Sequence, residues 1–358
     1  MYAVIIAGGS GTRFWPFSRK NRPKQFLRIT GNRSMIEETC DRLAPLVKDE
    51  EIIIVLGREH RDQAAALLKD RDIKILAEPI GRNTGPAIGL GALLARQTGC
   101  EGAIAFLPAD HFIGDTQSFL SCLDQAGKVA ESGGIVTLGI VPTRPETGYG
   151  YIRRSKSGPD SYKTPVYDVS AFVEKPDIET AGEYLTSGEY FWNAGIFVAT
   201  PETILKEIEI HLSGLHEGLM QLGGPFEGDS FEQRLEEVYN RLEPISFDYG
   251  IMEKTECPVY VIPCECAWSD VGSWASLYEL RERDHDASGN LSEGEAILVD
   301  CRNSVIAGKS GRLVACLGLK DCIIVDTDDA LLVADLGRSQ DIRRIVEKLK
   351  DTDKGELL

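Results

Sequence analysis

The chain has 358 residues, of which 42% are hydrophobic and 27% charged, so it has room for a sizeable core and for more than one domain. Its formal net charge of −17 argues against nucleic acid as a partner, because an acidic surface repels a polyanion. No apolar run approaches the ~20 residues of a membrane helix, and the first residues lack a signal-peptide pattern. The nine cysteines lack disulfide-like spacing. Together these features predict a cytoplasmic protein that does not enter a membrane.

The first predicted element is a buried strand at 4–7 that runs into a glycine-rich loop. Three of the four residues at 8–11 are glycines, so backbone N–H groups can lie open and approach an anion closely. Seven cations and no acid occur in the first 36 residues: Arg13, Arg19, Lys20, Arg22, Lys24, Arg28 and Arg33. In an acidic chain this gathering of positive charge predicts a phosphate-binding site, and the alternative is a solvated basic loop.

This loop fits neither of the two common nucleotide-binding loops. A Walker A loop ends in Gly-Lys-Ser/Thr, but Thr12 and Arg13 follow Gly11, and a Rossmann fingerprint needs a glycine where Phe14 stands. The stretch instead resembles the G-G-x-G-T-R-x-x-P signature of the sugar nucleotidyltransferases. Its extension through Pro23-Lys24-Gln25-Phe26 narrows the resemblance to the mannose-1-phosphate guanylyltransferases, also called GDP-mannose pyrophosphorylases.

The next part of the chain alternates short apolar strands with amphipathic helices. Strands are predicted at 52–56, 73–77 and 103–107, and helices at 35–47, 59–69 and 84–98. Such alternation predicts an α/β fold with a parallel sheet covered on both faces. The resemblance implies a Rossmann-like, mixed and mostly parallel sheet. Because ligands of open α/β sheets bind beyond the carboxyl ends of the strands, the residues that follow each strand are the candidates for function.

A polar turn follows the predicted strand at 73–77. Asn83 or Thr84 can cap the next helix, which leaves Glu78 without a structural explanation. The resemblance implies that Glu78, Asn83 and Thr84 lie at the nucleobase. A carboxylate can accept hydrogen bonds from both N1–H and the exocyclic amine of guanine, so Glu78 is a hypothetical guanine reader.

Two aspartates also follow strands, although they are far apart in the chain. Asp110 ends Leu107-Pro108-Ala109-Asp110, and Asp270 comes after a strand at 258–263. Either can be a turn former or a helix cap. Two acids that converge from two strands would also suit Mg²⁺, which takes one or two carboxylates together with phosphate oxygens. The resemblance, matched in full by W-S-D-V-G-S-W at 268–274, implies this metal role for both residues.

Three further sequence segments are candidates for binding a sugar. Gly150 lies in a Gly-rich aromatic stretch where backbone can pass close to a sugar ring. A strand at 166–173 ends in Glu174 and Lys175, most simply a solvated pair, and Asn193 is flanked by small residues. The motifs F-V-E-K-P and W-N-A-G-x-F are matched, and they imply that Glu174 and Asn193 bind sugar hydroxyls and that Lys175 binds the sugar phosphate. The block at 247–254 is interpreted as mainly structural, with the role of Asp248 left open.

The C-terminal part differs in composition. Two helices are predicted within 201–242. From about 295 to 335, short β-branched runs recur every 8–10 residues between Gly, Asp or Asn turns, and a helix is predicted at 338–350. We expect a catalytic domain at 1–284 and a small β-solenoid-like (left-handed β-helix-like) module at 285–358. That module is too small for a large core of its own, so it is expected to lean on the first domain or on a second subunit, giving a possible homodimer.

The resemblance implies the reaction GTP plus α-D-mannose 1-phosphate giving GDP-mannose plus diphosphate, with Mg²⁺. The sugar phosphate attacks the α-phosphorus in line, and it needs no general base because it is already an anion. Charge neutralisation is what two polyanions require. The expected catalytic residues are Arg13, Lys24, Asp110 and Asp270, and the expected nucleotide site comprises Gly8, Gly9, Ser10, Gly11, Thr12, Arg13, Glu78, Asn83, Thr84 and Asp110.

Two alternatives stay open. The enzyme could use another nucleotide or another hexose 1-phosphate. Alternatively, the chain could be a non-catalytic GDP-mannose-binding regulator. Such a regulator could lose the four expected catalytic residues without penalty, and all four are intact.

Overall fold

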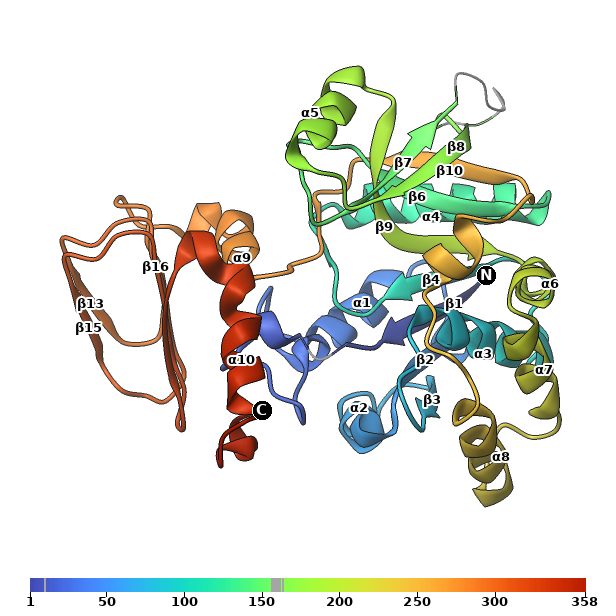
Figure 1. Cartoon of the computed structure of the whole chain (residues 1–358), viewed down its shortest axis with the longest axis horizontal. Helices are drawn as coiled ribbons and strands as arrows, with labels where there is room; N and C mark the ends of the chain where they lie inside the picture. The colour runs from blue at the N-terminus through green and yellow to red at the C-terminus, as the bar shows by residue number, and fades with distance from the viewer. Residues whose placement is uncertain (10, 156–161, 163) are drawn as a thin grey trace. The chain divides into compact units, whose positions relative to one another are not determined.

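The computed structural model describes residues 1–9, 11–155, 162 and 164–358. The chain forms two compact units that interleave along the sequence (Figure 1). The first unit comprises Met1–Gly8, Thr39–Ala109 and Ile113–Trp268, and the second comprises Gly9–Glu38, Asp110–Phe112 and Ser269–Leu358. The loops that follow β1 and β4 therefore belong to the second unit, although both strands belong to the first.

A nine-stranded sheet is the centre of the first unit, with strand order β3-β2-β1-β4-β9-β6-β10-β8-β7. Its strands are β1 (Tyr2–Ala7), β2 (Ile52–Gly57), β3 (Lys74–Glu78), β4 (Ile104–Pro108), β6 (Ile135–Ile140), β7 (Gly150–Arg154), β8 (Tyr167–Glu174), β9 (Tyr190–Ala199) and β10 (Val259–Cys264). The strands β3, β2, β1 and β4 run parallel, so their carboxyl ends share one edge, as predicted.

The other half of the sheet is less parallel than expected. Strand β9 is antiparallel to β4, β6 and β7. Strand β8 is antiparallel to β7 and β10, whereas β6 and β10 are parallel. The sheet is mixed, as predicted.

Helices cover the sheet on both faces. On one face, α3 (Thr84–Gln97), α6 (Pro201–His211), α7 (Ser213–Gln221) and α8 (Asp229–Tyr239) share a core with strand residues such as Val4, Ile53 and Phe106. Alternate strand residues point to the other face, where α4 (Thr116–Glu131) packs on β6 and β10. The remaining helices of this part of the chain are α1 (Met35–Leu43), α2 (Arg61–Leu67) and α5 (Ile178–Ser187).

Two helix predictions need correction. Three helices, not two, lie within 201–242, because Leu212 adopts φ −135° and ψ 55° and breaks the run between α6 and α7. Helix α4 was not predicted at all, although its N-cap Asp115 accepts from the backbone N–H of Ser118, which is a recognisable start signal. None of the helices in the described ranges combines the length and apolar character needed to cross a bilayer.

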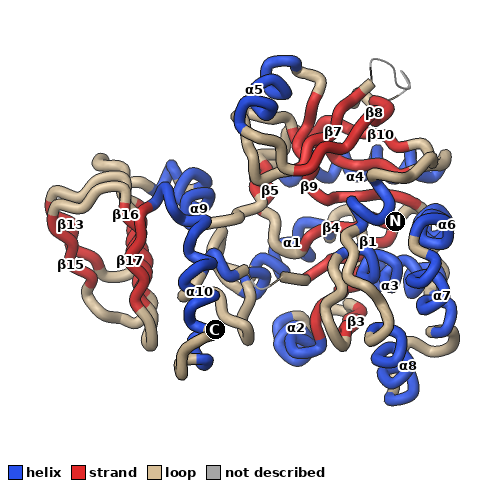
Figure 2. Tube along the Cα trace, viewed as in Figure 1, coloured by secondary structure: helices blue, strands red, loops and turns tan. Residues whose placement is uncertain are grey.

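The second unit contains the short strands that the sequence predicts (Figure 2). In one sheet β12 (Leu291–Glu293), β14 (Val305–Gly308) and β16 (Cys322–Asp326) are parallel, and β17 (Leu331–Asp335) pairs antiparallel with β16. A second pair, β13 (Ala296–Val299) and β15 (Val314–Leu317), is also parallel. Val305 pairs with Ile323 and Ala296 with Val314, eighteen residues further on in both cases.

Helices α9 (Trp274–Leu280) and α10 (Arg343–Leu349) complete this unit, and two short strands, β5 (Phe112–Ile113) and β11 (Trp268–Ser269), lie where the chain passes between the units. The predicted terminal helix is α-helical only from Arg343. The preceding segment, η7 (Leu336–Ile342), is a 3₁₀ helix interrupted at Arg338, where φ is −106° and ψ is 16°.

The core of the second unit includes the basic N-terminal loop. Phe14, Phe17 and Leu27 from this loop pack in one cluster with residues of α9, β14, β16 and α10. The ring centroids of Phe14 and Phe17 lie 5.3 and 5.2 Å from that of Trp274. The loop predicted to bind phosphate is therefore built onto the C-terminal module.

Candidate active site

The glycine-rich loop makes a left-handed turn against Lys24. Gly11 has φ 58° and precedes the 3₁₀ turn η1 (Thr12–Phe14). A Cβ atom on Gly11 would lie 2.5 Å from Lys24 Cβ and 3.0 Å from Lys24 N, so only glycine fits this close approach. Gly9 and Thr12 belong to the second unit, together with Gly11 and Lys24, whereas Gly8 ends the Met1–Gly8 segment of the first unit. Ser10 lies outside the described residues.

Lys24 joins the two predicted metal-binding aspartates. Its side chain is buried, and Nζ donates to the backbone carbonyl and to Oδ2 of Asp110, each at 2.8 Å, and to the backbone carbonyl of Asp270 at 2.5 Å. An ammonium group has three N–H donors, and these three acceptors match them. Asp110 and Asp270, 160 positions apart, are thus brought together as the sequence predicts.

The Asp110 carboxyl is charged in this setting. Burial alone would raise its pKa, but the charges of Lys24 and His111 and the hydrogen bond from Lys24 outweigh burial and hold the pKa below its usual value. The ion pair itself is little exposed, with 6% of the Lys24 side chain and 31% of the Asp110 side chain accessible. The cluster therefore offers a fixed ammonium beside a fixed carboxylate.

Backbone strain marks the Asp270 turn. Oδ1 of Asp270 accepts from the backbone N–H of Gly272 at 3.1 Å, and Val271 between them has φ 44°. A β-branched residue is rare in the left-handed region, and such outliers persist only where packing imposes them. Val271 is fully buried in the core of its unit, which supplies that packing.

Asp110 and Asp270 are two residues that could hold a divalent cation. Across the described ranges there is no group of three or more His, Cys, Asp or Glu side chains arranged around a metal. The chain could thus supply two carboxylate ligands and leave the other positions to water and phosphate oxygens, which is the usual environment of Mg²⁺.

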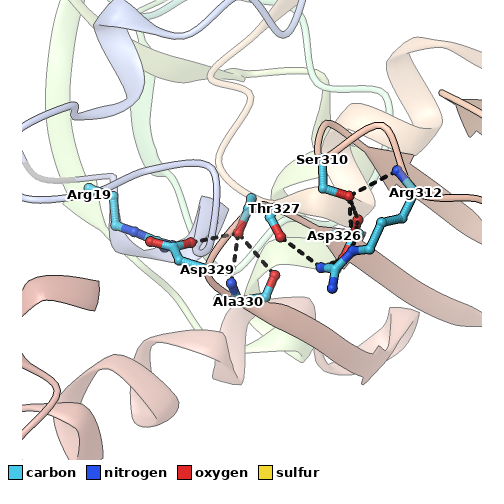
Figure 3. Close-up of polar contacts among 7 residues, drawn as sticks. All are labelled: Arg19, Ser310, Arg312, Asp326, Thr327, Asp329 and Ala330. Carbon is cyan, nitrogen blue, oxygen red and sulfur yellow. Dashed lines mark hydrogen bonds and ion pairs between the residues drawn. The ribbon is translucent and has the colours of Figure 1, made fainter.

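Arg13 and Arg19 have partners that the sequence did not reveal. Arg13 Nη1 donates to Oε1 of Gln340 at 2.9 Å. Arg19 Nη2 lies 2.8 Å from Oδ1 of Asp329 (Figure 3). Its guanidinium lies 5.4 Å from the ring centroid of Trp15. Both partners come from the C-terminal module, more than three hundred residues away in sequence, and no local pattern signals them.

A second cluster lies in the first unit and contains all the predicted sugar-binding residues. Gly150 on β7 pairs with Glu174 on β8 and with Asn193 on β9. A Cβ atom on Gly150 would lie 2.5 Å from Glu174 Oε2 and 3.4 Å from Asn193 Cβ. Lys175, with φ 46°, places its Nζ 2.5 Å from Glu174 Oε1. We call these four residues, with Asp248, the carboxylate–amide cluster.

Asp248 is the member that the sequence left undecided. It begins the π-helix η5 (Asp248–Met252), and its Oδ1 accepts from Nδ2 of Asn193 at 2.7 Å, while Oδ1 of Asn193 accepts from the N–H of Gly195 at 2.9 Å. The Asn193 amide is therefore held in one orientation. Burial raises the pKa of Asp248 and the Glu174 charge adds to the rise, although the hydrogen bond from Asn193 opposes it. A π-helix leaves no periodic signal in a sequence, which is why this contact was missed.

The three predicted nucleobase residues surround the start of α3. Asn83, at φ 70°, caps the helix by accepting from the N–H of Thr84 at 2.9 Å, and Thr84 Oγ1 accepts from the N–H of Phe247 at 2.9 Å. Glu78 ends β3 and is buried, and burial raises its pKa to about 7 even though the Tyr239 hydroxyl opposes the rise. Oε1 of Glu78 has no hydrogen-bond partner among the described residues.

Comparison with known proteins identifies close relatives of the whole chain. A family model described as Nucleotidyl transferase matches residues 2–287, and one described as MannoseP isomerase/GMP-like beta-helix domain matches residues 294–349. The chain is 41% identical over 357 residues to a mannose-1-phosphate guanylyltransferase of Escherichia coli, an alignment that covers 99% of this chain and 74% of that protein. It is 40% identical over 358 residues to the xanthan biosynthesis protein XanB of Xanthomonas campestris pv. campestris (strain B100), with the same two coverages. It is also similar to the crystal structure of a mannose-1-phosphate geranyltransferase from Thermus thermophilus, with a TM-score of 0.86, 36% identity, and coverage of 98% of this chain and 99% of that chain.

Proposed function

This chain belongs to the mannose-1-phosphate guanylyltransferase family of nucleotidyl transferases, and we propose that the clusters around Lys24 and Asn193 carry out its reaction. The enzyme transfers the guanylyl group of GTP to α-D-mannose 1-phosphate, which yields GDP-mannose and diphosphate. The observation that carries the assignment of residues is the buried Lys24 ammonium that holds Asp110 and Asp270 together.

In the proposed mechanism an oxygen of the sugar phosphate attacks the α-phosphorus of GTP. The bond from this phosphorus to the bridging oxygen breaks, and diphosphate leaves with that oxygen. Because the nucleophile is an anion at neutral pH, the chain has to supply positive charge rather than a base. Lys24, whose three N–H donors are already taken by Asp110 and Asp270, is assigned to the α-phosphate as a nearby positive charge. Arg13, with the backbone of residues 8–12, is assigned to the leaving diphosphate.

Asp110 and Asp270 are the proposed ligands of a divalent cation, and their hard oxygen donors favour Mg²⁺. When bound, the cation would supply charge neutralisation at the phosphate oxygens. The protein's own part is to keep both carboxylates in place. Lys24 bonds to the Asp110 carboxylate and to the backbone carbonyls of both aspartates, and the N–H of Gly272 holds the Asp270 carboxylate in the packed Val271 turn.

The carboxylate–amide cluster is the proposed site for the sugar. Glu174 and Asn193 would bind hydroxyls, and Lys175 would bind the sugar phosphate. The structural support is that Asn193 cannot flip its amide while Asp248 and Gly195 hold both ends, so it presents a fixed donor and a fixed acceptor. Glycine at position 150 supports the same assignment because it leaves room for the Glu174 carboxylate.

The nucleobase assignment rests on Glu78. Its raised pKa is that of a buried carboxyl group, and its Oε1 is without a hydrogen-bond partner among the described residues. We assign Glu78 to guanine, with Asn83 and Thr84 shaping the loop beside it. If the variant Glu78→Gln keeps the wild-type preference for GTP over UTP, this assignment is wrong.

For the C-terminal module we propose that the strand pairs spaced by eighteen residues are coils of a short β-solenoid, and that the domain boundary lies near 284. Exposed Leu317, Leu331 and Val333 on this module make it the proposed contact of a homodimer. Nine free cysteines support a cytoplasmic location.

The function is tested by measuring diphosphate release from four nucleoside triphosphates with each of three hexose 1-phosphates. The proposal predicts that GTP with mannose 1-phosphate has by far the highest kcat/KM. A higher value for another pair would assign a different specificity to the same chemistry. Tight binding of GDP-mannose without any diphosphate release would mean that the chain is a regulator.

A further inference from the structure

The basic loop between β1 and α1 makes a set of contacts that the chemistry above does not use. Four of its residues bond to the C-terminal module within the second unit. The contacts are Arg13 Nη1 to Gln340 Oε1 at 2.9 Å, Trp15 Nε1 to the carbonyl of Leu357 at 2.8 Å, Arg19 Nη2 to Asp329 Oδ1 at 2.8 Å, and the N–H of Lys20 to the carbonyl of Leu358 at 2.9 Å.

The loop needs such support because it has little regular structure of its own. Its helical parts are the two 3₁₀ turns η1 and η2 (Lys24–Phe26), each three residues long. A segment of this kind depends on the contacts it makes with other elements as well as on its own turn hydrogen bonds. Here those contacts are the shared aromatic core and the four bonds to the module.

The two arginine contacts differ in charge. Arg19 pairs with a carboxylate, so its charge is neutralised and it acts as an anchor. Its partner Asp329 is itself held in place, because Thr327 Oγ1 donates to Asp329 Oδ1 at 2.8 Å and the carbonyl of Thr327 accepts from Arg312 Nη2 at 2.9 Å (Figure 3). Arg312 is fixed in turn by the buried carboxylate of Asp326.

Arg13, in contrast, is held by a neutral amide. The Gln340 oxygen, on η7, takes one N–H of the guanidinium and leaves its full positive charge and its other N–H donors for an anion. A carboxylate at this position would hold the side chain equally well but would cancel the charge. A neutral acceptor is therefore the side chain that orients a phosphate-binding arginine without weakening it.

We propose that Gln340 is a positioning residue for Arg13, through which the C-terminal module orients the guanidinium towards the leaving diphosphate. This inference rests on the proposed role of Arg13. It gives the module a part in the transfer reaction: Asp329 and the Leu357–Leu358 backbone anchor the loop, and Gln340 sets the direction of its charged side chain.

The test is the variant Gln340→Met in the full chain, which keeps the length of the side chain and removes the acceptor. Steady-state rates are measured in both directions, with Arg13→Ala and the double variant alongside. Because Gln340 is exposed, its replacement should leave the melting temperature unchanged. We expect the KM for diphosphate in the reverse reaction to rise about fivefold to tenfold, the KM for GDP-mannose to stay constant, and the double variant to match Arg13→Ala.

The matched control is Arg338→Ala on the same 3₁₀ segment. Arg338 pairs with Asp341 at 3.0 Å, inside the module, and its replacement should change neither KM. Wild-type kinetics in Gln340→Met together with a defect in Arg13→Ala would overturn the positioning role alone. Wild-type kinetics in both variants would overturn the role of Arg13 and the inference with it. Fully additive effects in the double variant would show that Gln340 acts by another route.

Discussion

Gly150→Ala isolates the sugar site by adding one methyl group. The added Cβ would lie 2.5 Å from Glu174 Oε2, where ordinary contacts begin near 3.4 Å, so the carboxylate has to move by about 0.9 Å. The Glu174 side chain is 25% exposed and can swing outward, and the fold should therefore tolerate the change. Losing one hydrogen bond between a sugar hydroxyl and a carboxylate costs about 1.5–3 kcal/mol, and the mobile side chain places this case at the low end.

The expected result is a fall of about tenfold in kcat/KM for mannose 1-phosphate, with the KM for GTP unchanged. Diphosphate release at varied concentrations of each substrate measures both values. Gly182→Ala is the matched control, because nothing lies within 4 Å of a Cβ at that helix position. That control should keep wild-type kinetics and stabilise the fold by roughly 0.5–1 kcal/mol. An unchanged kcat/KM for mannose 1-phosphate in Gly150→Ala would refute the placement of the sugar beside Glu174.

Three further predictions concern polar groups that are buried or half-buried. Glu78→Gln should raise the free energy of unfolding by about 3 kcal/mol near pH 8 and by little near pH 4.5. The pKa of Glu78 rises from 4.5 to about 7 on folding, so the wild-type protein loses stability as the pH increases through that window. If urea titrations give the wild type and the variant the same dependence of unfolding free energy on pH, this prediction is wrong. Asp248→Ala should raise the KM for mannose 1-phosphate about tenfold, because it frees the Asn193 amide. Asp248→Asn keeps a hydrogen-bond acceptor and should bring the KM most of the way back to the wild-type value. An equal rise in KM in both variants would mean that the carboxylate charge matters more than the orientation of the amide. Lys24→Met should lower kcat by roughly 10²–10³ with both substrates saturating, and a kcat within twofold of wild type would remove Lys24 from the reaction.

Much of the fold could be predicted because its signals are local. The strands β1 to β4 read as short apolar runs between helical patterns, and their parallel order follows from that alternation. The strands of the C-terminal module could be placed because their short β-branched runs recur between Gly, Asp or Asn turns. The antiparallel β9, the break at Leu212 and the 3₁₀ character of η7 depend on contacts with distant residues, which one sequence does not reveal.

The candidate site shows the same division. Gly11, Lys24, Asp110 and Asp270 lie in recognisable motifs, and the structure brings the last three together. The partners that orient them could not be predicted. Gln340 meets Arg13 only because the N-terminal loop packs on the C-terminal module, a long-range contact without a sequence signal.

The central claim is that the cluster of Lys24, Asp110 and Asp270 is where GTP reacts. The most direct test is kcat for diphosphate release by Asp270→Asn with saturating GTP, mannose 1-phosphate and Mg²⁺. Asparagine keeps the side-chain oxygen that accepts from Gly272 and the carbonyl that accepts from Lys24, so the fold is preserved while one negative charge is removed. The proposed role predicts a loss of roughly 10²–10³ in kcat at an unchanged melting temperature. Wild-type turnover in this variant would contradict it.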